Sequence, residues 1–254
     1  MVETVKKSIK TLLCYSRKCY MLFRNLVFLK SFNPNVKNSK KEHNVFIKLY
    51  QKYRKYTMIP SQIFHENMRL VSEFKGLEGD FVECGVWKGG MAAAIAEFIG
   101  GDREFYLYDS FEGLPDVKPV DGVAAKKWQE DKTSDWYFDN CSADIHFAKE
   151  AMQLANVSNV HVTKGWFENT LPLHPNRPIA ILRLDGDWYD STMQCLDSLY
   201  PKVIEGGVVI IDDYYVWEGC SKAVHDYLSK IKSLSQIRTY AGGVCYLIKK
   251  DICF

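Results

Sequence analysis

The sequence lacks several features that would each have placed it in a broad class of proteins. It has no stretch of the roughly 18 consecutive apolar residues that a membrane-spanning helix requires, since the best candidate, residues 21–29, is interrupted by Arg24 and Asn25. The same stretch has no clear small-residue cleavage site, so we do not expect a secretory signal. The net charge of only +2 argues against general nucleic-acid binding.

The cysteines lack any spacing typical of metal binding. None of the eight forms a C-x-x-C pair, and their scatter fits no zinc-site pattern. Cys84, Cys195 and Cys245 lie within apolar runs, where a thiol behaves as a small hydrophobic side chain. We therefore expect a reducing compartment and a cytoplasmic protein.

Positive charge is concentrated at the start of the chain. Residues 1–41 contain ten Lys or Arg and one acid, Glu3. Residues 1–30 combine these bases with apolar residues at helical spacing, which predicts an amphipathic helix that packs on the body or on a second subunit, or lies on an anionic membrane. We assign residues 1–42 as a basic arm and linker, and expect a homo-oligomer with residues 1–60 at its interface.

The remaining chain shows the pattern of an α/β domain. Residues 43–75 are predicted to form a helical cap, broken near residues 57–60, and residues 76–254 a Rossmann-like core. Apolar runs predict strands at 81–84, 105–108, 160–163, 179–184 and 208–211, and helices at 91–98, 142–155, 191–200 and 221–230. This alternation predicts a mostly parallel sheet with helices on both faces. A last strand pair, 235–240 and 244–249, would add one antiparallel strand.

A glycine-rich turn with a preceding acid follows the first predicted strand. The run D-F-V-E-C-G-V-W-K-G-G places Glu83 before Gly85, Gly89 and Gly90. Glycines let the backbone approach a ligand closely, and the helix start offers free N–H groups. The dinucleotide fingerprint G-x-G-x-x-G is absent, and Glu83 would repel a pyrophosphate. This acid would instead attract an amino group, such as that of S-adenosylmethionine, which weakens the alternative of an NAD-dependent oxidoreductase.

A second acid ends the next strand. Asp109 follows Glu83 by one strand–helix unit, at the position where a carboxylate can accept hydrogen bonds from both ribose hydroxyls. The alternative is a surface-loop aspartate. We predict ribose binding from this register.

Four more carboxylates follow two strands that we expect to be neighbours. Asp185 and Asp187 end one strand, and Asp212 and Asp213 end the next. Like charges this close require compensation, and Mg²⁺ or another hard divalent cation prefers such oxygen ligands. We predict Asp185, Asp212 and Asp213 as metal ligands and Asp187 as the general base. The alternative for Asp187 is to cap the helix near residue 191, a role that Asp190 could also fill.

Five motifs in order carry a resemblance to a known family. They are F-V-E-C-G-V-W-K-G-G, Y-D-S-F-E-G-L-P, K-G-W-F-E-N-T-L-P, L-R-L-D-G-D-W-Y-D-S-T and G-G-V-V-I-I-D-D-Y. Over about residues 45–250 the chain resembles the macrocin O-methyltransferase family, whose members methylate sugar hydroxyls and need Mg²⁺. The resemblance implies a seven-stranded class I methyltransferase fold with S-adenosylmethionine as cofactor.

The resemblance also implies roles for individual residues. It places Thr57 and Met58 in a segment that folds over the cofactor, and Trp166 near the adenine. The expected cofactor-binding residues are then Thr57, Met58, Glu83, Gly85, Gly89, Asp109, Ser110, Trp166 and Asp185. The loop at 117–137, with Trp128 and Trp136, is particular to this chain and is where we expect the acceptor to bind.

The predicted function is metal-dependent O-methylation of a sugar or glycoside. A first alternative is methylation of a catechol or other phenol, which acceptor preference would distinguish. A second is a non-catalytic protein that keeps a methyltransferase fold. The clustered acids speak against the second, because mutually repelling carboxylates have no reason to persist in a lapsed site.

Overall fold

The computed structural model of the chain describes residues 40–241 and 243–250. The predicted basic helix of residues 1–30 lies outside the described residues, so its membrane or subunit contacts stay predictions, as does the division at residue 42. In the described part of the chain, no helix has both the length and the apolar character that crossing a bilayer requires.

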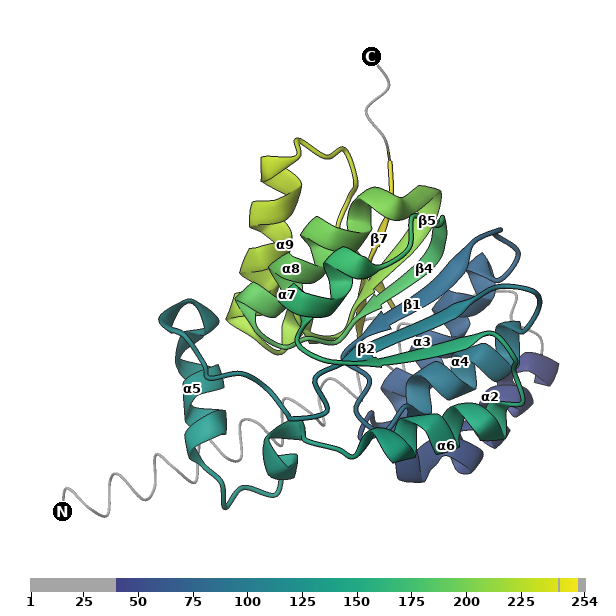
Figure 1. Ribbon diagram of the computed structural model, residues 1–254, viewed down its shortest axis with the longest axis horizontal. Coiled ribbons are helices and arrows are strands. Elements are labelled where there is room, and N and C mark those ends of the chain that lie inside the picture. Colours follow the sequence, from purple (N-terminus) through teal and green to yellow (C-terminus); the bar gives the residue numbers. More distant parts are fainter. Residues whose placement is uncertain (1–39, 242, 251–254) are drawn as a thin grey trace. The chain divides into compact units, whose positions relative to one another are not determined.

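A seven-stranded sheet forms the centre of residues 40–250 (Figure 1). Its strands are β1 (Asp80–Cys84), β2 (Phe105–Asp109), β3 (Val160–Lys164), β4 (Ile179–Leu184), β5 (Val203–Ile211), β6 (Arg238–Tyr240) and β7 (Val244–Ile248). The strand order is β3-β2-β1-β4-β5-β7-β6, and β7 runs antiparallel to both of its neighbours. The predicted fold class, with one antiparallel strand, is confirmed.

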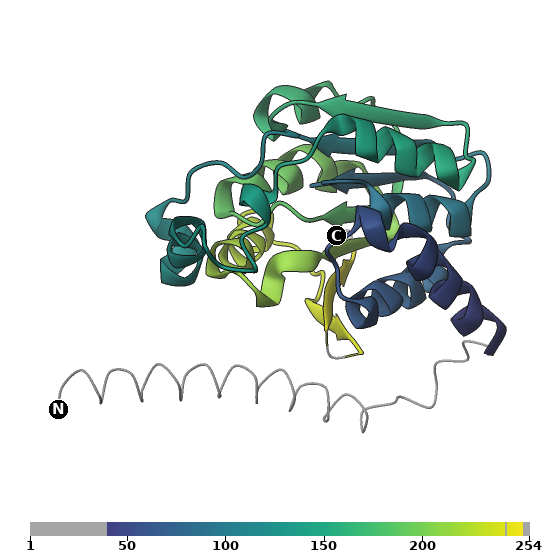
Figure 2. The same cartoon turned by 90° about the horizontal axis from the view of Figure 1, so that it is seen from below.

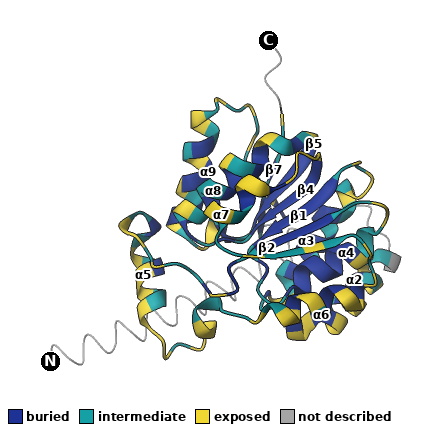
Figure 3. Ribbon diagram, in the orientation of Figure 1, coloured by how far each residue is buried: buried dark blue, intermediate teal, exposed yellow. Residues whose placement is uncertain are grey.

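Helices cover both faces of the sheet (Figures 1 and 2). They are α2 (Lys40–Tyr53), α3 (Ser61–Phe74), α4 (Gly90–Ile99), α5 (Gly122–Glu130), α6 (Ile145–Ala155), α7 (Phe167–Thr170), α8 (Tyr189–Leu199) and α9 (Glu218–Lys230). Alternate strand residues face two cores: Phe81 and Ile181 pack with α2, α3, α4 and α6, whereas Val82 and Leu182 pack with α8 and α9. Figure 3 shows the resulting buried centre.

The carboxyl ends of four strands lie level with one another. Cys84 of β1 pairs in register with Tyr108 of β2 and Leu184 of β4, and Leu184 pairs with Ile211 of β5. Every polar residue that follows these strands therefore meets at a single edge of the sheet, where parallel α/β sheets bind ligands.

Strand β5 and the segment at 117–137 differ from the sequence-based expectation. Strand β5 begins at Val203, five residues earlier than predicted, because it continues through Gly206 and Gly207 with a register shift against β4. Glycines usually interrupt a strand pattern, so this first part could not be recognised. The segment at 117–137 also contains a helix, α5, which projects beyond the sheet in Figures 1 and 2.

Candidate active site

The turn after β1 brings the chain against the turn after β4. Gly85 has φ +83°, and its N–H donates to the carbonyl of Tyr108 at 2.9 Å. A Cβ at this position would lie 1.6 Å from the carbonyl oxygen of Asp185. Only glycine can occupy this position, which places the predicted cofactor turn directly beside the first acid of the predicted metal site.

The start of α4 touches the segment that precedes α3. A Cβ on Gly90 would lie 2.7 Å from the carbonyl carbon of Tyr56 and 2.9 Å from the amide nitrogen of Thr57. Thr57 and Met58 are half-buried there, and the hydroxyl of Thr57 accepts the N–H of Ile59 at 3.1 Å. The structure thus brings the backbone of Thr57 to the start of α4, and the role of Thr57 and Met58 in covering the cofactor stays a prediction.

Asp109 organises the turn that follows β1. Its Oδ2 accepts the N–H groups of Val86 and Trp87 at 2.6 and 2.8 Å, and its Oδ1 accepts the N–H of Phe111 at 2.6 Å. Burial raises the pKa of Asp109, while these three N–H donors act in the opposite direction. The sequence predicted a ribose ligand, and the structure adds a turn-forming role for the same carboxylate.

Ser110 and Trp166 both lie near the end of β2. The Ser110 hydroxyl donates to the carbonyl of Gly113 at 2.8 Å, so the side chain closes the next turn. Gly165 donates its N–H to the carbonyl of Asp109 at 2.9 Å, which sets the half-buried Trp166 beside that strand end. Both predicted residues therefore reach the expected edge of the sheet.

A buried arginine that the sequence reasoning did not assign lies at the centre of the site. Arg183 is 1 % exposed. One guanidinium nitrogen donates to Glu83 at 2.6 Å and Asp185 at 2.8 Å, and the other donates to Asp212 at 2.6 Å. A guanidinium presents donors in a planar fork and stays charged, so one side chain can hold three carboxylates.

Arg183 could have been found from the sequence. It is the single charged residue in the strand Ile-Ala-Ile-Leu-Arg-Leu. A charge within a buried strand requires buried partners of opposite sign. The acids at the neighbouring strand ends were the available partners.

Glu83 is the most buried acid of the site, and only one of its two carboxylate oxygens is hydrogen-bonded. It is 1 % exposed, and its Oε2 has no hydrogen-bond partner among the described residues. Burial raises the pKa of Glu83 to about 7, against the opposing effect of Arg183. A buried carboxylate oxygen without a donor is costly, which makes this atom a natural acceptor for a ligand's ammonium group.

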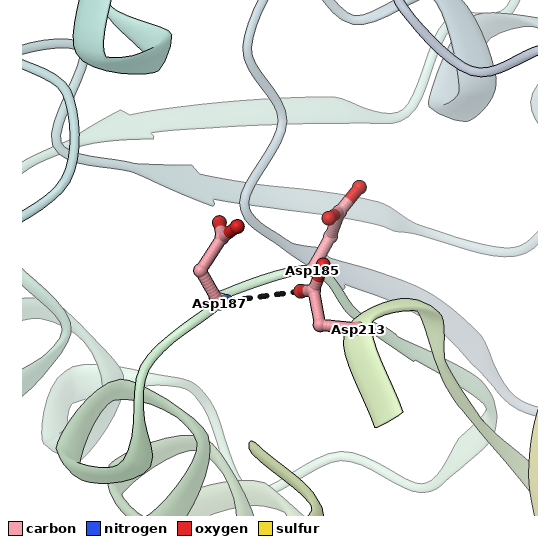
Figure 4. Close-up of side chains that lie close together, drawn as sticks. All are labelled: Asp185, Asp187 and Asp213. Atoms are coloured by element: carbon pink, nitrogen blue, oxygen red, sulfur yellow. Dashed lines mark hydrogen bonds between the residues drawn. The ribbon is translucent and has the colours of Figure 1, made fainter. Parts of the chain in front are cut away.

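Three of the four predicted aspartates gather closely enough to share one cation. Asp185, Asp187 and Asp213 each offer an oxygen, and these oxygens lie within 4.8 Å of one another (Figure 4). Asp187 has φ +57°, and its N–H donates to Oδ2 of Asp213 at 2.9 Å. Asp212, which the sequence assigned as a ligand, lies outside this group and bonds to Arg183.

Asp187 does not cap a helix. Helix α8 begins at Tyr189, after Trp188, without any side-chain cap, and Asp190 forms an ion pair with Lys118. Oδ1 of Asp187 instead accepts the indole N–H of Trp217 at 2.8 Å. Burial and then the charge of Asp185 raise the pKa of Asp187 well above its ordinary value, so this carboxyl readily takes up a proton.

The segment at 117–137 is fixed beside these acids. Asp121, which is 2 % exposed, accepts the N–H of Tyr189 at 2.7 Å and so ties the segment to the start of α8. The ring of Trp128 lies 5.9 Å from that of Trp217 between centroids. Trp136 is 63 % exposed, which leaves an aromatic surface on the segment that the sequence assigned to the acceptor.

Comparison with known proteins identifies the fold and its chemistry. A family described as Macrocin-O-methyltransferase (TylF) matches residues 31–241. The chain belongs to this family. It is therefore an S-adenosylmethionine-dependent O-methyltransferase, which confirms the predicted family and enzyme class.

Curated relatives of the TylF family are similar over much of the chain. One is the demethyldecarbamoylnovobiocin O-methyltransferase of Streptomyces niveus, 34% identical over 72% of this chain and 72% of the relative. Another, from Streptomyces olivaceus, is named 8-demethyl-8-(2,3-dimethoxy-alpha-L-rhamnosyl)-tetracenomycin-C 4'-O-methyltransferase and is 37% identical. The match with this second relative spans 60% of this chain and 59% of the relative, which is under two thirds of its length.

Solved structures agree with this assignment. The O-methyltransferase NovP superposes with a TM-score of 0.65 at 30% identity, over 77% of this chain and 83% of that chain. A calicheamicin methyltransferase superposes with a TM-score of 0.57 at 21% identity, over 84% of this chain and 95% of that chain, and shares the fold.

Proposed function

We propose that this TylF-family enzyme methylates a hydroxyl of a sugar or glycoside, with S-adenosylmethionine as methyl donor and a divalent cation at the aspartate group. The observation that carries the proposal is the gathering of Asp185, Asp187 and Asp213 beside the glycine turn of β1. The names of the relatives support the acceptor class, because one of them specifies a rhamnosyl group.

Glu83 and the glycine turn fit the methionyl end of the cofactor. The spare Oε2 of Glu83 suits an ammonium group, and the positive φ angles of Gly85 and Gly89 form the turn that leads from β1 into α4. Asp109 has lone pairs beyond the three N–H bonds it accepts, which suits ribose hydroxyls. Ser110 and Trp166 complete the ribose and adenine side, and Thr57 with Met58 covers it.

The aspartates fit a hard cation such as Mg²⁺, since all of them offer oxygen ligands. We assign Asp185, Asp212 and Asp213 as the ligands. Asp212 can serve through the oxygen that does not bond to Arg183. When bound, the cation supplies positive charge that lowers the pKa of a nearby acceptor hydroxyl.

Asp187 is assigned as the general base. It lies within the group of three acids, yet it is not among the three carboxylates that Arg183 holds. A carboxylate without a cationic side-chain partner keeps a higher proton affinity, as the removal of an acceptor's hydroxyl proton requires. The proton moves to Oδ2, because Oδ1 already accepts the Trp217 indole.

A methyl-transfer screen tests the acceptor class. Tritiated S-adenosylmethionine is offered with p-nitrophenyl α-L-rhamnoside, a TDP-linked deoxysugar or 3,4-dihydroxybenzoate, each with MgCl₂ or EDTA. The proposal expects Mg²⁺-dependent methylation of a glycoside. Transfer only to the ortho-diphenol would favour the phenol alternative.

A further inference from the structure

The indole of Trp217 contacts the aspartate group directly. Its Nε1 donates to Oδ1 of Asp187 at 2.8 Å. Trp188, by contrast, is 2 % exposed and donates its Nε1 to the carbonyl of Pro115 at 2.9 Å. The two indoles therefore do different things: one donor satisfies a backbone group, whereas the other satisfies a carboxylate of the site.

The Trp217 ring is held on two sides. Its centroid lies 5.3 Å from that of Trp188 and 5.9 Å from that of Trp128, and both pairs meet edge to face. Aromatic pairs of this kind favour a defined relative orientation. The direction of the Nε1–H bond is consequently set by packing before any ligand binds.

The backbone of Trp217 is tied to the same site. Its N–H donates to the carbonyl of Asp213 at 3.0 Å, and the residue stands at the start of α9 in an extended conformation. Trp217 thus contacts one proposed metal ligand through its backbone and the proposed base through its side chain. Trp217 therefore adds a second link between the turns that follow β4 and β5, beside the direct bond from the Asp187 N–H to Asp213.

We propose that Trp217 is a positioning residue, which holds Asp187 in one orientation so that Oδ2 faces the acceptor hydroxyl. The inference rests on the proposed role of Asp187 as base. A carboxylate on a left-handed turn can rotate, and an indole donor on Oδ1 selects which oxygen is left to accept the proton. Trp128 of α5 acts through the Trp217 ring, which couples the acceptor segment to the base.

Indole ¹⁵N–¹H spectra test the bond itself without any acceptor. Six tryptophans give six indole signals, and Trp217→Phe and Trp188→Phe identify two of them. We expect the Trp217 signal to lie downfield and to move upfield in Asp187→Asn, because a donor to a carboxylate is more strongly polarised than a donor to an amide. A Trp217 signal that Asp187→Asn leaves in place would overturn the inference. Asp187→Asn retains every tryptophan, so this arm does not depend on the folding of Trp217→Phe.

Kinetics with the best acceptor of the screen test the role. Trp217→Phe keeps the ring and removes the donor, and we expect kcat to fall about 10- to 100-fold, as is typical for groups that orient a site residue. The KM for acceptor and the Kd for S-adenosylmethionine should stay within about twofold. Tyr200→Phe also keeps a ring and removes a hydrogen-bonding group, but before the start of β5 and away from the aspartates, and should keep kcat within about threefold. Equal losses in both variants would assign Trp217 to packing alone.

The two proposals fail separately. If no glycoside is methylated while the Trp217 signal still responds to Asp187→Asn, the sugar acceptor is wrong and the positioning contact stands. If glycosides are methylated and Trp217→Phe has the kcat of the wild type, the acceptor class stands and the positioning role is wrong.

Discussion

The two halves of the site occupy the same edge of one sheet but differ in how their charges are satisfied. On the β1–β2 side, Asp109 accepts three backbone N–H groups and Glu83 pairs with Arg183. On the β4–β5 side, the side chain of Asp187 accepts one indole N–H and that of Asp213 accepts one amide N–H. In the described chain no cationic side chain is paired with either of these two acids. The lack of a cationic side-chain partner for Asp187 and Asp213 among the described residues supports the proposed cation at the β4–β5 half.

Arg183 marks the border between the halves. It holds Glu83 of the first half together with Asp185 and Asp212 of the second. Its positive charge offsets part of the repulsion among these carboxylates. From the sequence alone, a metal ion was the predicted source of all of this compensation. Asp187 and Asp213 are the acids of the group that have no cationic side-chain partner among the described residues. The proposed cation is therefore expected to bind beside these two carboxylates.

The largest effect is expected from removing the unpaired acid. Asp187→Asn keeps the shape and the Trp217 bond but cannot accept a proton, so kcat should fall by about 10²- to 10⁴-fold. The Kd for S-adenosylmethionine, measured by calorimetry, should change little, because Glu83 and Asp109 lie on the other half. Asp197→Asn, on the exposed side of α8, is the matched control. A comparable loss of cofactor affinity would contradict the division into halves.

The next effect is on stability. Arg183→Met leaves Glu83, Asp185 and Asp212 without their buried cation, and we expect the free energy of unfolding to fall by about 3–5 kcal/mol. Urea denaturation measures the change. Lys230→Met breaks only an exposed pair with Asp197 and should cost less than about 1 kcal/mol. If the free energy of unfolding falls by the same amount in both variants, Arg183 does not hold the two halves together.

The sequence alone was sufficient to predict which residues lie at the carboxyl ends of the strands. Continuous apolar strands with acids directly after them predicted which residues would meet, and the observed register brings them level. Strand pattern and chain direction determine this placement, because parallel strands end at one edge. The same reasoning recovered Glu83, Gly85 and Asp109 at the expected edge.

The partners of those acids could not be predicted in the same way. The bond between Asp212 and Arg183 depends on side-chain directions at the 3-10 turn after β5, and the bond between Asp187 and Trp217 depends on the left-handed backbone at Asp187. Residue spacing carries no information about such directions. The charge of Arg183 in a buried strand was a usable signal, whereas Trp217 in a loop gave none.

A smaller effect should follow from pH and Mg²⁺. Burial raises the folded-state pKa of Asp187 and Asp213, so the folded state binds protons more tightly than the unfolded chain. The contribution of these two groups to stability without metal should be fully present below the unfolded aspartate pKa of about 4 and be lost as pH rises through the higher folded values. Mg²⁺ must displace these protons, so its stabilisation should be larger at pH 8 than at pH 5.

Thermal unfolding with MgCl₂ against NaCl of equal ionic strength checks this expectation. At about 100 times the dissociation constant, Mg²⁺ should add roughly 2.7 kcal/mol. Asp213→Asn should abolish the difference between the two salts. If Mg²⁺ stabilises the protein equally at both pH values, the cation does not bind beside Asp187 and Asp213 as proposed.

The smallest expected effect lies on the β1–β2 half. Gly90→Ala would place a methyl group 2.7 Å from the backbone of Tyr56, and overpacking of this kind typically costs about 1–3 kcal/mol. If that displacement moves Thr57 and Met58 away from the cofactor, the Kd for S-adenosylmethionine should rise about tenfold, the equivalent of about 1.4 kcal/mol. Gly76→Ala, which meets nothing within 4 Å, is the control. Because Asp187 and Asp213 are untouched, Mg²⁺ stabilisation should persist in Gly90→Ala. A lowered stability with an unchanged Kd would mean that Thr57 and Met58 do not contact the cofactor.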